Sequence, residues 1–117
     1  MATAPKRGEV WLIQFEPAVG AEMRKIRPAV VISRDEVGRL PLRLVVPITD
    51  WKPWHAQCPW FVPLPASRAS GLFKTSGADA FQTKSVFVTR FVRRLGHASR
   101  AQLDEIAAAI ALCIGLP

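Results

Sequence analysis

Ten prolines and seven glycines divide this 117-residue chain into apolar runs of only a few residues each. Helix-breaking and turn-forming residues at this frequency leave little room for long helices and favour short strands joined by turns. At this length we expect one domain over residues 1–117, with a core that needs no metal or disulfide. The expected strands are 10–15, 29–33, 43–48, 60–62 and 85–88, with a weaker candidate at 78–82. The pattern predicts a small, mainly-β barrel.

Two of the expected strands carry a further prediction about their place in a sheet. The run 29–33 is almost continuously β-branched, which is typical of a strand that is buried on both faces. The run 43–48 contains Pro47, which has no N–H to donate to a neighbouring strand. We therefore expect Pro47 at a strand end or on a sheet edge.

The last segment has a helical period instead of a strand period. Ser99 precedes Gln102 by three residues, the spacing of a capping box, and Gly115 and Pro117 close the helix. The apolar residues that recur at helical intervals are Leu103, Ile106, Ala107, Ile110 and Ile114. Residues 106–116 carry no charge, so a helix that is apolar on every side there needs cover from a barrel, a second subunit or both.

The charge balance points to a polyanionic partner. Sixteen Lys and Arg against nine Asp and Glu give a formal net charge of +7. An excess of this size on a short chain favours binding to nucleic acid, an acidic protein or a membrane surface. The uncharged run 106–116 is about half as long as the roughly 20 residues that cross a bilayer. We therefore expect a cytoplasmic protein without a membrane span.

Cysteine and histidine are too sparse for the usual metal sites. Cys58 and Cys113 are far apart and belong to no Cys-x-x-Cys pair, and only His55 and His97 are present to join them. We assign no metal and no other cofactor. Both histidines lie among turn-forming residues, where we expect them to face solvent instead of serving as general bases. Residues 50–59 hold two tryptophans and two prolines, which predicts a long, semi-rigid loop that exposes aromatic surface for binding.

The densest polar cluster precedes the run 29–33 and ends in Arg27-Pro28. Three cations within four residues can neutralise phosphates, and the planar guanidinium of Arg27 matches a phosphate better than a lysine does. Thr49, at the end of the run 43–48, offers a hydroxyl to the same kind of group. The alternatives are a solvated loop of mixed charge for Arg27 and a turn-capping hydroxyl for Thr49. Spacing alone does not bring the two residues together.

Six segments follow one another in a recognisable order along nearly the whole chain. They are Lys6-Arg7-Gly8-Glu9-Val10-Trp11, Glu16-Pro17 with Gly20 and Glu22, Arg27-Pro28-Ala29-Val30-Val31-Ile32-Ser33, Val46-Pro47-Ile48-Thr49, Gln82-Thr83-Lys84-Ser85 and the tail 95–116. In this order they resemble the MazF/PemK family of toxin endoribonucleases. The resemblance implies a small SH3-like β-barrel of the CcdB/MazF type with a C-terminal helix. It also implies a homodimer and an acidic antitoxin as partner.

The activity implied by the resemblance is metal-independent cleavage of single-stranded RNA. The ribose 2′-hydroxyl attacks the adjacent phosphate and leaves a 2′,3′-cyclic phosphate and a 5′-hydroxyl end. Arg27 matches the family's catalytic arginine and Thr49 its catalytic threonine. The expected RNA-binding residues are Glu22, Arg24, Lys25, Gln82 and Lys84. The chain departs from the family pattern at Ala21, where Ser or His is usual, and at Phe81, where an acidic residue is usual.

Two other function classes remain open. One is a non-catalytic member of the same fold that acts by protein contact, as the CcdB gyrase poisons do. The other is a basic RNA-binding barrel. The pair Arg27 and Thr49 favours the nuclease, whereas Ala21 and Phe81 favour the alternatives.

Overall fold

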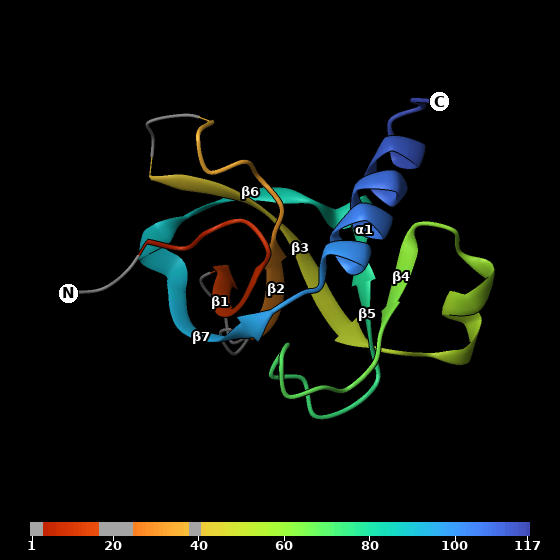
Figure 1. Ribbon diagram of the computed structural model, residues 1–117, viewed down its shortest axis with the longest axis horizontal. Helices are drawn as coiled ribbons and strands as arrows, with labels where there is room; N and C mark the ends of the chain where they lie inside the picture. Colours follow the sequence, from red (N-terminus) through yellow and green to blue (C-terminus); the bar gives the residue numbers. More distant parts are fainter. Residues whose placement is uncertain (1–3, 17–24, 38–40) are drawn as a thin grey trace.

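The computed structural model describes residues 4–16, 25–37 and 41–117, which form a curved antiparallel sheet and one C-terminal helix (Figure 1). The strands are β1 (Glu9–Glu16), β2 (Lys25–Val31), β3 (Leu42–Asp50), β4 (Phe61–Leu64), β5 (Ser76–Asp79), β6 (Lys84–Phe87) and β7 (Phe91–His97). Short 3-10 helices are η1 (Pro53–Gln57), η2 (Ala80–Gln82) and η3 (Val88–Arg90), and the α-helix is α1 (Arg100–Cys113).

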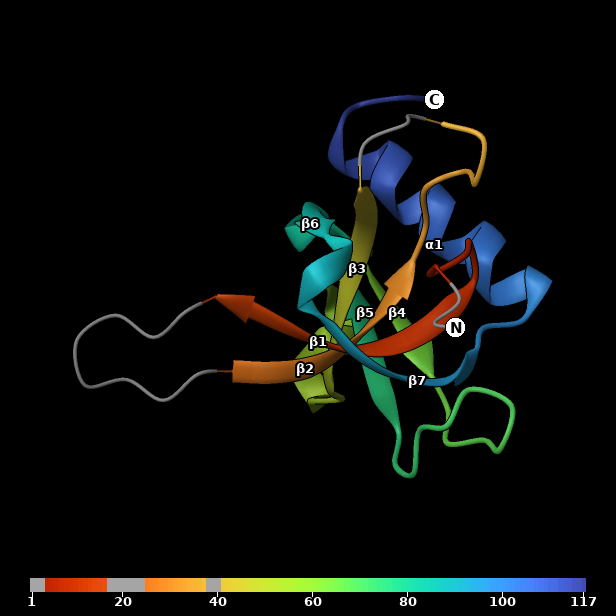
Figure 2. The same ribbon diagram turned by 90° about the vertical axis from the view of Figure 1, so that its left-hand side faces the viewer.

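The strands lie in the order β4-β5-β3-β2-β1-β7, and β6 pairs with the first half of β3. The pairing between β1 and β7 shifts register twice, after Val10 and after Leu12. Such irregularities increase the local twist of a sheet and bend it. Figure 2 shows the resulting curvature, with β1 and β7 crossing the lower part of β3 and with α1 at the upper right beside β3. The predicted mainly-β, barrel-like fold with a C-terminal helix is confirmed.

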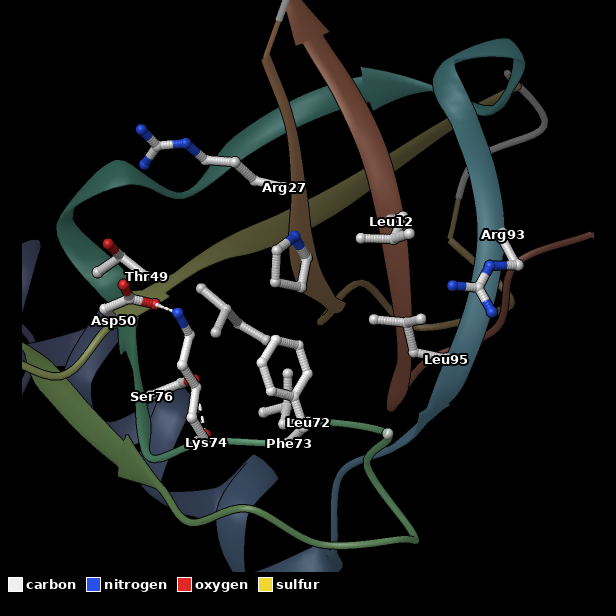
Figure 3. A pocket seen from close by; sticks show the side chains of 13 residues that line it. Leu12, Arg27, Thr49, Asp50, Leu72, Phe73, Lys74, Ser76, Arg93 and Leu95 are labelled. Carbon is white, nitrogen blue, oxygen red and sulfur yellow. Dashed lines mark hydrogen bonds and ion pairs between the residues drawn. The ribbon is translucent and has the colours of Figure 1, made fainter.

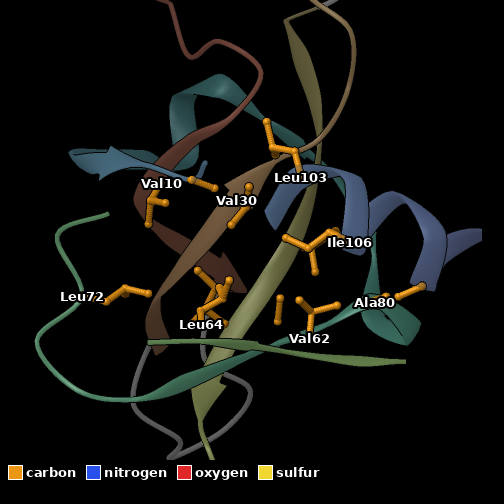
Figure 4. Packing of buried hydrophobic residues seen from close by; sticks show 13 residues of the cluster. Val10, Val30, Val62, Leu64, Leu72, Ala80, Leu103 and Ile106 are labelled. Atoms are coloured by element: carbon orange, nitrogen blue, oxygen red, sulfur yellow. The ribbon is translucent and has the colours of Figure 1, made fainter. Parts of the chain in front are cut away.

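The core is divided between the two faces of β2 and β3. Val30 and Val46 belong to one cluster, which also holds Ile106 of α1 (Figure 4). Their neighbours Val31 and Val45 belong to a second cluster on the opposite face. All four valines are fully buried, because successive side chains of a strand point to opposite faces and both faces are covered. The prediction of a strand buried on both faces is confirmed for β2.

The C-terminal helix begins as the sequence predicts. The Ser99 hydroxyl accepts from the Gln102 N–H at 3.1 Å, and the Gln102 side-chain oxygen accepts from the Ser99 N–H at 2.8 Å. These two bonds complete the capping box and satisfy donors that would otherwise be free at the helix start. Leu103 and Ile106 are buried against the sheet, whereas Leu112 beyond them is half exposed. The barrel therefore covers one side of the helix, along which Ala109 and Cys113 also pack against the core, and leaves Leu112 exposed on another side.

Three expectations about strands need correction. Pro47 lies inside β3 and not at its end, but β6 pairs with β3 only as far as Val45 and β5 begins at Ile48, so one edge of β3 is unpaired at the proline. The weaker candidate 78–82 is wrong in its second half, because Asp79 accepts from the Phe81 N–H and turns the chain into η2. The strand β7 was not predicted, since its register shifts interrupt the apolar alternation.

Candidate functional site

Strand pairing brings Arg27 and Thr49 together. The register between β2 and β3 pairs Ala29 with Pro47 and Val30 with Val46. Extending this register by two residues sets Arg27 opposite Thr49, and both line one cavity of about 480 Å³, here called the Arg27–Thr49 cavity (Figure 3). Arg27 lies in β2, paired with Ile13 of β1. Its expected position in a loop before the strand is therefore wrong.

The Arg27–Thr49 cavity has an apolar floor and a charged rim. Five strands contribute to it, β1, β2, β3, β5 and β7, together with the loop between β4 and β5. The lining residues are Leu12, Arg27, Pro28, Ile48, Thr49, Asp50, Gly71, Leu72, Phe73, Lys74, Ser76, Arg93 and Leu95. Three cations against one carboxylate among these residues leave a net charge of +2. A concave site with an apolar floor strengthens the attraction of such cations for an anion, because water screens them less.

Asp50 pairs with one of the three cations. Lys74 Nζ lies 2.9 Å from Asp50 Oδ1. The hydrogen bond from Lys74 is the largest cause that lowers the pKa of Asp50 below its ordinary value. Loss of solvation is the next largest and raises the pKa, and the charges of Lys74, Lys52 and Arg27 lower it further. Asp50 is therefore ionised at neutral pH. Within the described ranges, Arg27 and Arg93 form no ion pair, so their charges are available to an anion in the cavity.

The loop between β4 and β5 (residues 65–75, here the β4–β5 loop) is pressed against the backbone of β7. A Cβ atom on Gly96 would lie 2.1 Å from the carbonyl oxygen of Ala69, and one on Gly71 would lie 2.3 Å from that of Leu95. The backbones approach this closely only because both positions are glycine. The His97 N–H also donates to the Ala69 carbonyl at 2.8 Å. This contact holds the loop at the rim of the cavity.

Of the predicted RNA-binding residues whose side chains the structure describes, Gln82 and Lys84, neither lines the cavity. The Gln82 amide nitrogen donates to Asp79 Oδ2 at 3.0 Å, and Lys84 Nζ lies 5.2 Å from the centre of the Phe15 ring. Glu22 and Arg24 lie outside the described residues, as does Ala21. Only the backbone of Lys25, the first residue of β2, is described.

The two histidines differ in environment. His55 is buried, its Nδ1 accepts from the Lys52 N–H at 3.0 Å, and its ring stacks on Phe61 with 3.9 Å between centres. The expectation that His55 faces solvent is wrong, because η1 folds its loop back onto β4. His97 is exposed as expected. Trp54 remains 58% exposed, which confirms an exposed aromatic surface on this loop.

The described part of the chain holds neither a cluster of metal ligands nor a helix that could span a membrane. No three His, Cys, Asp or Glu side chains gather there closely enough to hold a metal ion. None of its helices has the length and apolar character to cross a membrane. Cys58 and Cys113 are both free thiols.

Sequence reasoning missed Phe73, Lys74 and Arg93 at the rim of the cavity. Lys74 and Phe73 follow Gly71 in a segment without strand or helix periodicity. The available signal was the adjacent pair of an aromatic residue and a cation after a glycine, a combination found in loops that bind nucleic acid. Arg93 lies in β7, which was itself missed.

The family described as the PemK-like, MazF-like toxin of type II toxin–antitoxin systems matches residues 6–114. This chain belongs to that family. Endoribonuclease MazF9 of Mycobacterium tuberculosis is 33% identical over 117 residues, covering 95% of this chain and 97% of the relative. Endoribonuclease EndoA of Bacillus subtilis is 25% identical over 111 residues, covering 95% of each chain.

Solved members of the family share the fold as well. The chain superposes on the MazE–MazF crystal structure (Form-III) of Deinococcus radiodurans with a TM-score of 0.75 and 25% sequence identity. The match covers 98% of this chain and 100% of that one. The family and the fold predicted from the ordered segments are confirmed.

Proposed function

We propose that this chain is an endoribonuclease, the toxin of a type II toxin–antitoxin pair, and that it cuts single-stranded RNA without a metal ion. The observation that carries the proposal is that Arg27 and Thr49 line the same concave site, whose lining has a net charge of +2. Family membership and the endoribonuclease relatives support it.

The reaction needs no atom beyond the RNA itself. The ribose 2′-oxygen forms a bond to the adjacent phosphorus while the bond from phosphorus to the 5′-oxygen breaks. The 2′-hydroxyl loses its proton and the departing 5′-oxygen gains one, which leaves a 2′,3′-cyclic phosphate and a 5′-hydroxyl. Negative charge grows on the non-bridging phosphate oxygens as the phosphorus becomes pentacoordinate. Donors fixed in advance at those oxygens are the most effective means of catalysis.

Arg27 and Thr49 are the proposed donors. Arg27 donates its planar pair of N–H groups to the non-bridging oxygens and stabilises their growing charge. The Thr49 hydroxyl donates to the same phosphate and positions it. The apolar floor under both residues, including Ile48 and Leu12, makes these bonds stronger than they would be in water.

We propose that the nucleotides on either side of the scissile phosphate are bound by the other residues that match the family pattern. These are Glu22, Arg24, Lys25, Gln82 and Lys84. Since the Gln82 amide nitrogen donates to Asp79, its amide oxygen is the part that accepts a hydrogen bond from a base. Lys84 supplies a positive charge for a flanking phosphate.

The proposed partners are an acidic antitoxin and a second copy of the chain, in the cytoplasm. The net charge of +7 favours an acidic antitoxin, and the solved MazE–MazF complex supports such a partner. A homodimer is favoured by the apolar side chains that the barrel leaves exposed near the helix end, which include Phe81, Leu112 and Ile114. Free thiols at both cysteines suit a reducing compartment.

The test is cleavage of a long single-stranded RNA by the purified protein in EDTA, followed by mapping of the ends. We expect 5′-hydroxyl and 2′,3′-cyclic phosphate ends, and no cleavage where the ribose at the cut site lacks its 2′-hydroxyl. Arg27→Ala should lower the rate by about 100-fold or more and remain folded, because Arg27 is exposed.

A matched control is Arg100→Ala, which removes the same charge at the start of α1, far from the lining of the cavity. It should cleave at nearly the wild-type rate. Wild-type cleavage by folded Arg27→Ala, or cutting of the deoxy-substituted RNA, would refute the proposed site or the proposed nucleophile respectively.

A further inference from the structure

Phe73 is an apolar ring that the fold leaves almost wholly in solvent. It is 88% exposed, more than any other large hydrophobic side chain in the part of the chain that the structure describes. The ring nevertheless lies at the rim of the Arg27–Thr49 cavity (Figure 3). Lys74 Nζ lies 5.6 Å from the ring centre. An exposed aromatic face beside several cations contributes little to folding and is suited to a ligand.

The backbone that carries the ring is held on both sides. Leu72, the residue before it, is buried in the core, and Lys74, the residue after it, is paired with Asp50 at 2.9 Å. The loop that carries them is pressed against β7 at Gly71 and Gly96. The backbone therefore cannot easily turn Phe73 inward to bury it. An aromatic side chain on such a backbone has only two rotatable bonds to fix when a ligand covers it, which keeps the loss of conformational freedom small.

We propose that Phe73 stacks on the base of a nucleotide that flanks the scissile phosphate. This inference rests on the proposed endoribonuclease activity and adds a base-binding residue to it. Single-stranded RNA is bound by cations that follow its phosphates and by aromatic rings on which its bases stack. With one phosphate at Arg27 and Thr49, Arg93 is a cation of the rim that the structure leaves available to a neighbouring phosphate, and the Phe73 ring lines the same cavity.

The surroundings favour RNA over a protein as the occupant. Aromatic anchors of protein interfaces are surrounded by apolar contacts that exclude water. The rim around Phe73 instead holds Arg27, Lys74 and Arg93. Every base has a flat aromatic face, so the stacked ring contributes to affinity more than to the choice of base.

The first experiment compares Phe73→Ala and Phe73→Trp with the wild type. The probe is a single-stranded RNA with a 2′-deoxy ribose at its mapped cut site, which binds without being cleaved. Phe73→Ala should weaken its binding about 5- to 100-fold, the range for loss of one stacked base, and should raise KM on cleavable RNA more than it lowers kcat. Phe73→Trp keeps a flat ring and should bind within about 3-fold of the wild type.

The matched control is Phe87→Ala. Phe87 lies on β6, is 53% exposed and does not line the cavity, so its removal should leave RNA affinity unchanged. Because Phe73 makes little contact with the core, Phe73→Ala should also unfold at the wild-type temperature. A loss of affinity therefore reports on RNA and not on folding.

The second experiment replaces the bases of the probe one at a time by abasic sites. An abasic site at one position next to the cut should weaken binding to the wild type and leave binding to Phe73→Ala unchanged, because the partner of that base is already gone.

Wild-type affinity and KM in Phe73→Ala would overturn the stacking role and leave the endoribonuclease proposal intact. If Phe73→Ala weakened binding of an acidic antitoxin but not of RNA, the stacking role would also be overturned, and Phe73 would instead be a contact residue for a protein. If the wild type neither bound nor cleaved RNA, the proposed function would fall and the stacking role with it.

Discussion

Gly96→Ala should displace the β4–β5 loop and so reduce cleavage, although Gly96 itself does not line the cavity. A Cβ at this position would lie 2.1 Å from the carbonyl oxygen of Ala69, whereas real Cβ atoms essentially never approach closer than 3.0 Å. The atoms in contact belong to backbone, which cannot rotate away as a side chain would. The loop must therefore retreat from β7 by about 0.9 Å, the difference between these two distances.

The loss of folding free energy that Gly96→Ala causes can be estimated from this contact. Overfilling a packed contact costs about 1–3 kcal/mol, which includes weakening of the 2.8 Å hydrogen bond from His97 to Ala69. For a domain of this size we expect the melting temperature to fall by about 4–12 °C. A displacement of about 1 Å in a binding residue can reduce catalysis as much as 100-fold. Since Lys74 and Phe73 move with the loop, kcat/KM should fall about 10-fold or more.

The assay measures thermal unfolding and RNA cleavage at 20 °C, where both proteins remain folded. Gly115→Ala is the control, because Gly115 has a positive φ of 77° but nothing within 4 Å of an added Cβ. It should lose about 1–2 kcal/mol of stability through backbone strain alone and cleave normally. Wild-type stability in Gly96→Ala would refute the close contact. Lower stability with wild-type cleavage would refute the role of the loop in positioning the rim.

Two further predictions concern charge and assembly. The pKa of Asp50, followed by NMR, should lie below its ordinary value of 3.8 and rise towards it in Lys74→Ala. Because the folded-state pKa is lowered, the stability due to this pair is present at neutral pH and disappears as the pH falls through that lowered value; an unchanged pKa in Lys74→Ala would contradict the ion pair as its cause. Leu112→Glu places a charge on the half-exposed end of α1 and should convert a dimer into a folded monomer in sedimentation experiments, whereas a dimer of unchanged affinity would place the interface elsewhere.

Several features of this protein follow from short-range rules and could be predicted from the order of its residues. The capping box at Ser99 and Gln102 forms because its two hydrogen bonds span only three residues. The two-sided burial of β2 follows from an unbroken β-branched run. The ordered segments around Arg27 and Thr49 were sufficient to predict the family. The first two features are local, because the residues that form them are neighbours in the sequence, and the third depends on short motifs whose order is visible in the sequence.

The composition of the site depends on contacts between distant segments. Arg27 and Thr49 lie 22 residues apart in the sequence and meet only because β2 and β3 pair in one particular register. Lys74 joins them through its ion pair with Asp50, and the loop that carries it is held by two glycines, one of them in β7. No local pattern specifies such a register or such a backbone contact. They are decided when the sheet curls and buries both faces of its central strands, because only then do these distant segments come into contact.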